Sequence, residues 1–295
     1  MAKQVETILV TGADGQLGQS CGALTKAYPQ ARFLFAGKAQ LSITDREAVL
    51  TFFKEHKPDA CINAAAYTKV DLAESEKELA FSVNADAVGY LAEACAEQKA
   101  TLIHFSTDYV FNGMKAEGYH PDDETDPINI YGASKRKGEE LALAHNPDTL
   151  IFRTSWVYSP FGQNFVKTMM RLMKERSEIR VVADQTGRPT YAPDLARFIM
   201  DLLMKSDHRP PGCYHYANKG AITWHTFATA IRDLCGLDCA VIPITSAEFP
   251  TPARRPHFSI LNTERTEQCF GIQIPDWTTG LATCLHQLRE PNERT

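Results

Sequence analysis

Strand-like and helix-like segments alternate along the first two thirds of the chain, and this alternation restricts the fold more than any other feature. Short runs rich in β-branched and aromatic residues are separated by segments long enough to form a helix. Strands joined by helical crossovers lie parallel, with helices on both faces of the sheet. The sequence therefore predicts an α/β fold with a doubly wound parallel sheet. Its strands are expected at residues 6–11, 33–36, 60–63, 101–106 and 149–153, and helices at 46–56 and 76–98.

The pattern changes after about residue 205, where a run of chain-breaking residues begins (HRPPG, 208–212). Short strands then mix with helices, which is typical of a smaller α+β domain. A chain of 295 residues has room for two domains. We therefore expect a dinucleotide-binding domain and a C-terminal substrate domain, the first at 1–155 with about 176–205 and the second at about 156–175 with 206–295.

Charge and hydropathy argue against two kinds of partner. The net charge is −5, with no long run of either sign, so we expect no nucleic-acid partner. No apolar stretch approaches the roughly 18 residues of a membrane span, and the opening residues MAKQVETILV do not resemble a secretion signal. We therefore expect no membrane partner.

The eight cysteines are scattered along the chain. They form no C-x-x-C pair, and no Cys/His cluster has the spacing of zinc ligands. Scattered cysteines of this kind are typical of reduced thiols in the cytoplasm. The sequence thus predicts a cytoplasmic protein without a metal site.

Three glycines follow the first expected strand at intervals of three, in the segment GADGQLG (12–18). In a strand–turn–helix context such glycines suit a tight turn, a close approach to a pyrophosphate and close helix packing. The pattern alone is weak, because chance produces it in about one chain in twenty. Its place after the first strand favours a nucleotide site of the Rossmann type over a simple turn.

Two further segments carry groups suited to proton transfer. Tyr131 and Lys135 stand four positions apart, on one face if the segment is a helix, and a lysine beside a phenol lowers the phenol's pKa. The same pair can also be an ordinary surface contact. Ser106, Thr107 and Asp108 end the fourth strand, at the edge where open parallel sheets bind ligands. A hydrogen-bonded strand end is the simpler explanation for this triplet.

Taken together, these segments resemble the extended short-chain dehydrogenase/reductase superfamily. Within it, the chain resembles the dTDP-4-dehydrorhamnose reductase family from the first strand to the last helix. The segments that carry the resemblance are NAAAYTKVD (63–71), STDYVF (106–111), RTSWVY (153–158), NFVKTM (164–169), VADQTGRPT (182–190), RPH (255–257) and PDW (275–277).

The resemblance implies an activity. Members of this family use a nicotinamide cofactor to reduce the 4-keto group of dTDP-4-dehydro-L-rhamnose, giving dTDP-L-rhamnose for cell-envelope polysaccharide. Transferred to this sequence, Tyr131 donates the proton to the alkoxide and Thr107 hydrogen-bonds the 4-oxygen. Lys135 holds the nicotinamide ribose and lowers the pKa of Tyr131.

The resemblance also implies two sets of binding residues. Small side chains at 64–66 let the cofactor cross the sheet edge, and a diphosphate needs charge-assisted donors. Expected at the cofactor are Gly12, Asp14, Gly15, Gln16, Leu17, Gly18, Lys38, Ser42, Ile43, Ala64, Ala65, Ala66, Tyr67, Ser106, Tyr131 and Lys135. Expected at the dTDP-sugar substrate are Thr68, Val70, Thr107, Asp108, Trp156, Asn164, Gln185, Arg188, Thr190 and Arg255.

Three departures from the family pattern bear on the cofactor and on assembly. Gly37 and Lys38 stand where an acidic residue often binds a ribose hydroxyl, which favours NADPH and leaves NADH open. Ser42-Ile43 replaces a frequent Asp-Ile contact to adenine. Some relatives form a dimer around magnesium through a glutamate, and the corresponding residue here is Ser20. The sequence is therefore compatible with a homodimer but does not require one, and no metal is expected.

Two other functions compete with the reductase. A sugar-nucleotide epimerase or 4,6-dehydratase shares the superfamily, but a dehydratase needs a second carboxylate where this chain has Tyr109. The regulatory β subunit of methionine adenosyltransferase also resembles this family and binds without catalysis. The presence of Thr107, Tyr131 and Lys135 favours an enzyme.

Overall fold

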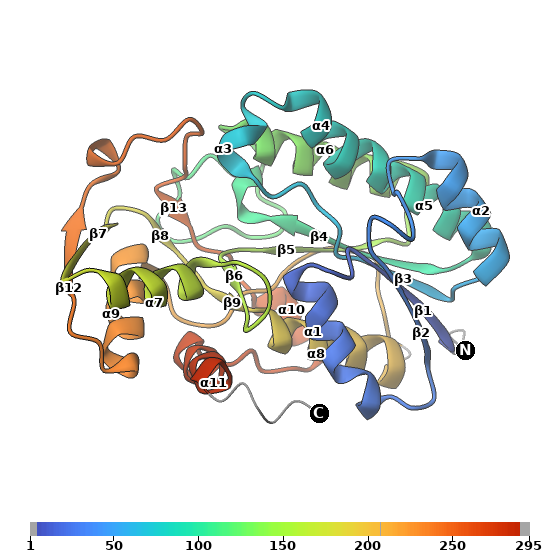
Figure 1. Cartoon of the computed structure of the whole chain (residues 1–295). Coiled ribbons are helices and arrows are strands. Elements are labelled where there is room, and N and C mark those ends of the chain that lie inside the picture. The colour runs from blue at the N-terminus through green and yellow to red at the C-terminus, as the bar shows by residue number, and fades with distance from the viewer. Residues whose placement is uncertain (1–4, 207, 290–295) are drawn as a thin grey trace.

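The computed structural model describes residues 5–206 and 208–289, and a six-stranded sheet lies at its centre (Figure 1). The strand order is β10-β5-β4-β3-β1-β2, and every neighbouring pair is parallel. All five strands expected from the sequence are present, so the predicted doubly wound fold is confirmed. The strands are β1 (Thr7–Thr11), β2 (Arg32–Ala36), β3 (Ala60–Asn63), β4 (Thr101–Thr107), β5 (Leu150–Thr154) and β10 (Gly212–His215).

Helices cover both faces of the sheet, because successive side chains of each strand point to opposite faces. Ile8 and Val10 of β1 share a core with α1 and α8, whereas Leu9 shares a core with α2, α5 and α6. Figure 1 shows the two helical layers on opposite sides of the strands. These helices are α1 (Gln16–Leu24), α8 (Ala192–Lys205), α2 (Arg46–His56), α5 (Ala87–Gln98) and α6 (Ile130–His145).

The strand order reverses between β1 and β3. β2 lies on one side of β1 and β3 on the other, and Thr11 and Asn63 are the last paired residues of the two strands. The loops that follow them therefore separate at the carboxyl edge of the sheet. Open α/β sheets bind ligands in the crevice that forms at such a point.

The helix expected at 76–98 is interrupted. A π-helical turn (Ser82–Asp86) separates α4 (Lys77–Phe81) from α5. Asn84 in this turn is buried; its side chain bonds the backbone N–H and C=O of Tyr67 and donates to the Ser134 hydroxyl. The turn thereby links the loop after β3 to helix α6. Single π-helical turns of this kind are frequent at functional sites.

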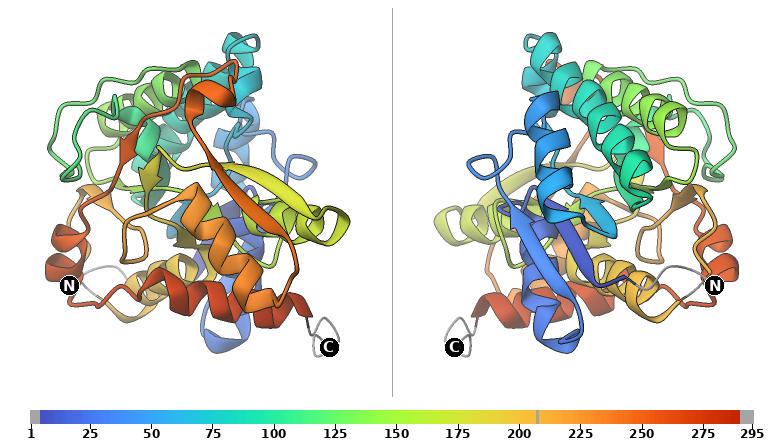
Figure 2. Two further views of the ribbon diagram at one scale, coloured as in Figure 1. Left: turned by 90° about the vertical axis from the view of Figure 1, so that its left-hand side faces the viewer. Right: turned by 90° about the vertical axis from the view of Figure 1, so that its right-hand side faces the viewer.

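A smaller α+β unit has a hydrophobic core of its own. In it β7 (Glu178–Val182) and β12 (Ala240–Ile244) pair in parallel. The left view of Figure 2 faces this unit, where α9 and α11 lie close together. Its helices are α7 (Phe165–Glu175), α9 (Trp224–Cys235) and α11 (Trp277–Arg289). Short strands lead into and out of it: β6 (Val157–Tyr158), β8 (Thr186–Gly187), β9 (Thr190–Tyr191), β11 (Ile222–Thr223) and β13 (Phe258–Ser259).

Two strands lie apart from the domains that the sequence suggested for them. β10 was expected in the C-terminal domain but pairs with β5 as the edge of the central sheet. β7 was expected in the dinucleotide-binding domain but pairs with β12. α10 (Glu264–Phe270) also packs beside β10. Sheet membership is set by pairing over long sequence distances, which local patterns do not report.

Within the described residues, no helix combines the length and the apolar character needed to cross a bilayer. Cys21, Cys61 and Cys95 are free thiols that are buried in the two cores of the sheet. They behave there as small apolar side chains.

Candidate active site

The glycine-rich loop after β1 packs directly against the loop after β3. Gly12 has a φ of +65°, and a Cβ at this residue would lie 2.5 Å from the Ala65 nitrogen. A Cβ at Gly18 would lie 2.4 Å from the carbonyl oxygen of Gly12. Both positions therefore require glycine. Gly15 caps α1 without a side-chain hydrogen bond, and a helix start of this kind suits a phosphate.

A cavity of about 500 Å³ opens beside this loop. We call it the cofactor cavity, because most of the residues predicted to bind the cofactor line it. These are Gly12, Asp14, Gly15, Lys38, Ser42, Ile43, Ala64, Ala65, Ala66 and Tyr67. Thr68, predicted at the substrate, lies in the same lining.

Sequence reasoning missed several residues of this lining. They come from the loop after β2, from the loop after β3, from α4 and from the π-helical turn. No motif marks the last two segments, whose approach to the cavity depends on how α4 packs. Besides Ala36 and Gly37 at the end of β2, the missed residues are Leu41, Thr44, Lys69, Glu76, Leu79 and Val83.

Three residues of the predicted cofactor set make contacts elsewhere. Gln16 donates from Nε2 to the carbonyl oxygen of Val157 and accepts at Oε1 from the Ser159 hydroxyl. It thereby joins α1 to the smaller unit. Leu17 packs against the core between the sheet and α8, and Ser106 is buried near the end of β4.

A carboxylate occupies the space beside Gly37. A Cβ at this glycine would lie 2.3 Å from Oδ2 of Asp14. Dinucleotide-binding folds often carry an acidic side chain near the end of the second strand, where it binds a ribose hydroxyl. Here Asp14 brings its carboxylate to that place from the loop after β1. Lys38 lines the same cavity, so a carboxylate and an ammonium stand together at this end.

Thr107 ends β4 at the carboxyl edge of the sheet. Its hydroxyl donates to Oδ1 of Asp108 over 3.0 Å and accepts from the Tyr109 N–H over 3.2 Å. Thr107 and Asp108 are both buried. Burial raises the pKa of Asp108 to about 6, while hydrogen bonds from Ser259 and Thr107 act in the opposite direction.

Helix α6 carries Tyr131 and Lys135 on the same side, as their spacing predicts. Asn129 caps the helix by accepting the Gly132 N–H over 2.8 Å. A Cβ at Gly132 would lie 2.0 Å from the Tyr109 carbonyl oxygen, so this glycine lets α6 begin against the turn after β4. The close approach places Tyr131 beside Tyr109, with ring centroids 5.8 Å apart, and beside Thr107.

The sequence suggested that Lys135 lowers the pKa of Tyr131, but burial dominates in this structure. Burial raises the pKa of Tyr131 to about 12, and a hydrogen bond with Thr107 lowers it by less. Burial also lowers the pKa of Lys135 to about 8, with Glu139 acting in the opposite direction. Each shift has the sign expected when a charged form loses its water.

A second cavity, of about 590 Å³, lies between the sheet loops and the smaller unit. We call it the substrate cavity. Gln185 and Arg255 of the predicted substrate set line it. Sequence reasoning missed its apolar walls, which come from segments far apart in the chain. The missed residues include Met114, Ile128, Phe165, Met169, Val181, Trp224 and Phe249.

Arg255 forms a two-pronged ion pair with Asp71 at the edge of the substrate cavity. Its Nη1 lies 3.0 Å from Oδ1 of Asp71, and its Nη2 lies 2.8 Å from Oδ2. The pair holds the pKa of the Asp71 carboxyl below its usual value. Asp71 belongs to α3 (Val70–Ala73), which begins at the predicted substrate residue Val70. The guanidinium is thus fixed toward the cavity by a carboxylate.

The remaining residues of the predicted substrate set make contacts within the protein. Trp156 has a φ of +47° and stacks on Trp224 with ring centroids 3.5 Å apart. Asn164 caps α7 by accepting the Lys167 N–H over 3.2 Å. The assignment of both residues to the substrate stays a prediction.

Two further predicted residues are Thr190 on β9 and Arg188 in the loop between β8 and β9. The buried Thr190 hydroxyl accepts from Thr154 over 2.9 Å. Arg188 donates from Nη1 to the Leu261 carbonyl oxygen over 2.8 Å. Both contacts position the segment next to Gln185, which reaches the cavity itself.

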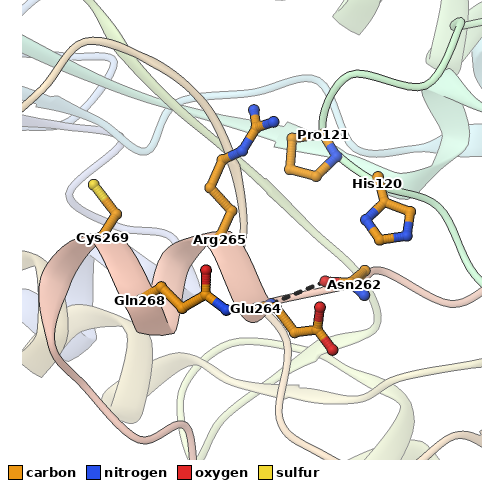
Figure 3. A pocket seen from close by; sticks show the side chains of 7 residues that line it. All are labelled: His120, Pro121, Asn262, Glu264, Arg265, Gln268 and Cys269. Atoms are coloured by element: carbon orange, nitrogen blue, oxygen red, sulfur yellow. Dashed lines mark hydrogen bonds between the residues drawn. The ribbon is translucent and has the colours of Figure 1, made fainter.

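A third cavity, of about 450 Å³, lies between α10 and the loop at His120 and Pro121 (Figure 3). None of the predicted site residues lines it. Both Glu264 and Arg265 line this cavity, and the guanidinium of Arg265 pairs with Asp122. In residues 5–206 and 208–289, no group of three or more His, Cys, Asp or Glu side chains is placed to hold a metal ion.

The arrangement around α6 defines the class of the protein. A tyrosine and a lysine on one helix stand beside a strand-end hydroxyl on a doubly wound sheet. The same sheet carries the cofactor cavity, although none of these three residues lines it. The substrate cavity is completed by a C-terminal unit. This is the architecture of the extended short-chain dehydrogenases and reductases.

Comparison with known proteins identifies the family. The chain matches the family described as RmlD substrate binding domain over residues 6–290. It is 41% identical to a dTDP-4-dehydrorhamnose reductase of Aggregatibacter actinomycetemcomitans over 283 residues, which cover 93% of this chain and 96% of that protein. The chain belongs to the dTDP-4-dehydrorhamnose reductase family, and it is an oxidoreductase.

Two solved structures with the same description share the fold of the whole chain. The enzyme of Clostridium acetobutylicum superimposes with a TM-score of 0.92 at 39% identity, covering 96% of this chain and 99% of that one. The enzyme of Bacillus anthracis, in complex with NADP, superimposes with a TM-score of 0.91 at 40% identity and covers 96% and 100%.

Proposed function

We propose that this chain reduces the 4-keto group of dTDP-4-dehydro-L-rhamnose to give dTDP-L-rhamnose, with NADPH as cofactor and NADH as an alternative. One observation carries the proposal. The close contact of Gly132 with the Tyr109 carbonyl oxygen brings the phenol of Tyr131 to the hydroxyl of Thr107. A proton donor and a hydrogen-bond donor therefore meet at the carboxyl edge of the sheet, where a carbonyl group can be reduced.

The residues present fit a nicotinamide dinucleotide. Gly12 and Gly18 leave room for the backbone alone, and small side chains at 64–66 continue the cofactor cavity across the sheet edge. The start of α1 suits the pyrophosphate. Asp14 and Lys38 lie where the ribose hydroxyls or a 2′-phosphate would bind. When bound, the reduced cofactor supplies a hydride to C4 of the sugar.

The protein supplies the proton and orients the ketone. Tyr131 donates its phenolic proton to the 4-oxygen, so that the carbonyl becomes a hydroxyl. Thr107 donates a hydrogen bond to the same oxygen and stabilises the negative charge that develops on it. Its hydroxyl leaves Oδ1 of Asp108 to do so, because one hydroxyl proton cannot serve two acceptors. Lys135, one helical turn after Tyr131 on α6, is the residue proposed to hold the nicotinamide ribose, and burial lowers its pKa to about 8.

The substrate cavity suits a nucleoside diphosphate sugar. Its apolar walls can hold a thymine base, and Arg255 offers charge-assisted donors to a diphosphate. Asp71 already pairs with this guanidinium, so the phosphate oxygens share or replace that carboxylate. Gln185, Arg188 and Thr190 lie on one segment beside the cavity and complete the proposed contacts, with Thr68, Val70, Asp108, Trp156 and Asn164.

The purified protein tests the proposal directly. We expect loss of NADPH absorbance on addition of dTDP-4-dehydro-L-rhamnose, and no loss with dTDP-glucose, which has no ketone at C4. A non-catalytic subunit would bind NADPH without oxidising it. A 4,6-dehydratase would convert dTDP-glucose to a keto sugar without net use of NADPH. Either result would overturn the reductase proposal.

The proposal extends to location, assembly and domain roles. The free thiols of Cys21, Cys61 and Cys95 suit a reducing compartment, so we place the enzyme in the cytoplasm. The central sheet with α8 forms the dinucleotide-binding part, and the unit around β7 and β12 forms the substrate part. We propose a homodimer that needs no metal, and sedimentation with and without EDTA tests it.

A further inference from the structure

A chain of four buried polar side chains runs beneath the active site. The Thr11 hydroxyl donates to Oδ1 of Asn63 over 2.8 Å, and Nδ2 of Asn63 lies 3.1 Å from Nδ1 of His104. Nε2 of His104 lies 3.4 Å from Nζ of Lys135. All four side chains are buried. The chain therefore connects the end of β1 to the lysine of α6.

The direction of this chain is fixed at Asn63. Its Oδ1 accepts the backbone N–H of Ala65 as well as the Thr11 hydroxyl. A backbone N–H can only donate, so the oxygen of the amide must face Ala65. Nδ2 consequently faces His104 and donates to Nδ1. An accepting Nδ1 carries no proton, so the neutral imidazole carries its proton on Nε2.

The N–H of His104 therefore faces the amino group of Lys135. An uncharged amine has a lone pair that accepts this N–H, whereas an ammonium has only donors and opposes it. Nζ also donates to the Phe105 carbonyl oxygen over 2.6 Å, which both forms of lysine can do. His104 is thus the contact that distinguishes the two forms.

One other charged group near this pair, Glu139, acts on Lys135 in the direction opposite to His104. Glu139 on α6 favours the ammonium, but both its oxygens are held by Arg153 from β5, at 2.9 and 2.7 Å. Asp108, from the turn after β4, acts on Tyr131. From β3 the amide of Asn63 faces His104. Burial thus lowers the pKa of Lys135 and Glu139 raises it, and the N–H of His104 acts in the same direction as burial.

We propose that His104 is a positioning residue that directs its Nε2–H at Lys135 and thereby controls when this lysine carries a proton. The inference deepens the proposed function, because it assigns a partner to the lysine that acts with Tyr131. It predicts that Lys135 gains and loses its proton near neutral pH. In this pH range Tyr131 and Lys135 must together take up a proton after each turnover. Burial and Lys135 hold the pKa of His104 well below its usual value, which keeps the imidazole neutral throughout.

Nuclear magnetic resonance of the cofactor-free protein tests this without any assay of activity. The ¹⁵N shifts of the His104 ring report which nitrogen carries the proton, and ¹³Cε of Lys135 reports the charge of the amine. We expect a proton on Nε2 alone, with Lys135 titrating near its pKa of about 8. A proton on Nδ1, or on both nitrogens, would overturn the proposal whatever the enzyme does with substrate.

Two variants separate the imidazole from the general effect of burial. His104→Phe and His104→Leu both remove the N–H while keeping an apolar side chain in its place. We expect each to raise the pKa of Lys135 by about one unit. Thr11→Val is the matched control, since the Ala65 N–H still orients Asn63, and it should leave that pKa unchanged. An unchanged titration of Lys135 in a folded His104 variant contradicts the proposal.

The pH profile of the enzyme provides a second measurement, which would not change if His104 had only a structural role. In a folded His104→Phe enzyme, the alkaline limb of kcat/KM should shift upward with the pKa of Lys135. If the protein reduces no sugar at all, the proposed function fails while the ring and lysine shifts still decide the role of His104.

Discussion

Nζ of Lys135 lies 2.6 Å from the carbonyl oxygen of Phe105, so helix α6 is tied to β4 two residues before Thr107. Lys135 is almost fully buried, and its strongest contact is this backbone oxygen. The contact fixes the distance between the helix that carries Tyr131 and the strand that ends at Thr107. The lysine thus has a structural task as well as an electrostatic one.

Replacing this lysine should therefore weaken both folding and catalysis. Lys135→Met leaves the Phe105 carbonyl oxygen buried without its donor, which costs about 1–3 kcal/mol of unfolding free energy. Turnover and cofactor affinity should fall together, because the charge near the phenol and the ribose is lost. Urea unfolding, steady-state rates and NADPH titration measure the three effects. Arg136→Met, at an exposed residue of the same helix, is the control and should change none of them strongly.

Lys38 should favour NADPH through its positive charge at the ribose end of the cofactor cavity. Lys38→Glu reverses that charge, so the ratio of kcat/KM for NADPH to that for NADH should fall by roughly tenfold or more, equivalent to 1.4 kcal/mol. Rates with each cofactor at fixed ionic strength check this. An unchanged ratio would show that Lys38 does not contact the 2′-phosphate.

Asp14 should have the opposite effect, because its carboxylate stands beside Gly37 and repels a 2′-phosphate. Asp14→Asn keeps the shape of the side chain and removes the charge. The preference for NADPH should rise by several-fold, with kcat unchanged, since Asp14 takes no part in the proposed proton transfer. The same pair of cofactor titrations measures it. A stronger preference for NADH in Asp14→Asn would contradict this arrangement.

The local pattern of the sequence predicts the sheet and one helix start well. The buried strands of a parallel sheet are continuous apolar runs, as in ILV (8–10), and they stand out between helices. The helix expected at 46–56 begins at Arg46, where the Asp45 side chain accepts the Ala48 N–H. Tyr131 and Lys135 share a helix because their spacing and the capping residue Asn129 are local features.

Features that depend on distant partners could not be predicted in the same way. Asp71 and Arg255 are 184 positions apart, and nothing in either segment marks them as an ion pair. The residues of β10 alternate apolar and polar side chains and do not indicate which sheet the strand joins. Its pairing with β5 makes it part of the central sheet. The contact between His104 and Lys135 could not be predicted either, because a single histidine in an apolar strand does not indicate which side chain packs against it.

Asp108 should make the stability of the protein depend on pH in an unusual direction. Burial raises its pKa from 3.8 to about 6, so the folded protein holds this proton more tightly than the unfolded chain. Its contribution is complete below pH 3.8 and is lost as the pH rises through about 6. The loss amounts to about 3 kcal/mol at most. The Asp108→Asn variant has no titratable group at this position, so it does not lose this stability as the pH rises.

The measurement is the difference in unfolding free energy between Asp108→Asn and the unmodified protein. This difference should move in favour of the variant between pH 4 and pH 7, by about 1–3 kcal/mol. Asp122→Asn is a control with the opposite sign, because Arg265 lowers the pKa of that exposed carboxyl. A difference for Asp108→Asn that does not change with pH would mean that Asp108 stays ionised in the folded protein.

Tyr131→Phe tests the mechanism itself. The change keeps the ring and its edge-on contact with Tyr109, whose centroid lies 5.8 Å away, and removes only the transferable proton. General acid catalysis typically contributes 10²–10⁴-fold, so kcat should fall by roughly that factor while the Kd for NADPH changes little. Burial holds the pKa of Tyr131 at about 12, so the phenol stays protonated throughout the neutral range and no loss of the acid should appear below pH 9. Steady-state rates and cofactor titrations of the two proteins provide the comparison. If Tyr131 were simply a packed residue of α6, Phe would preserve full activity, and a rate within a few-fold of the unmodified enzyme would remove the phenol from the reaction.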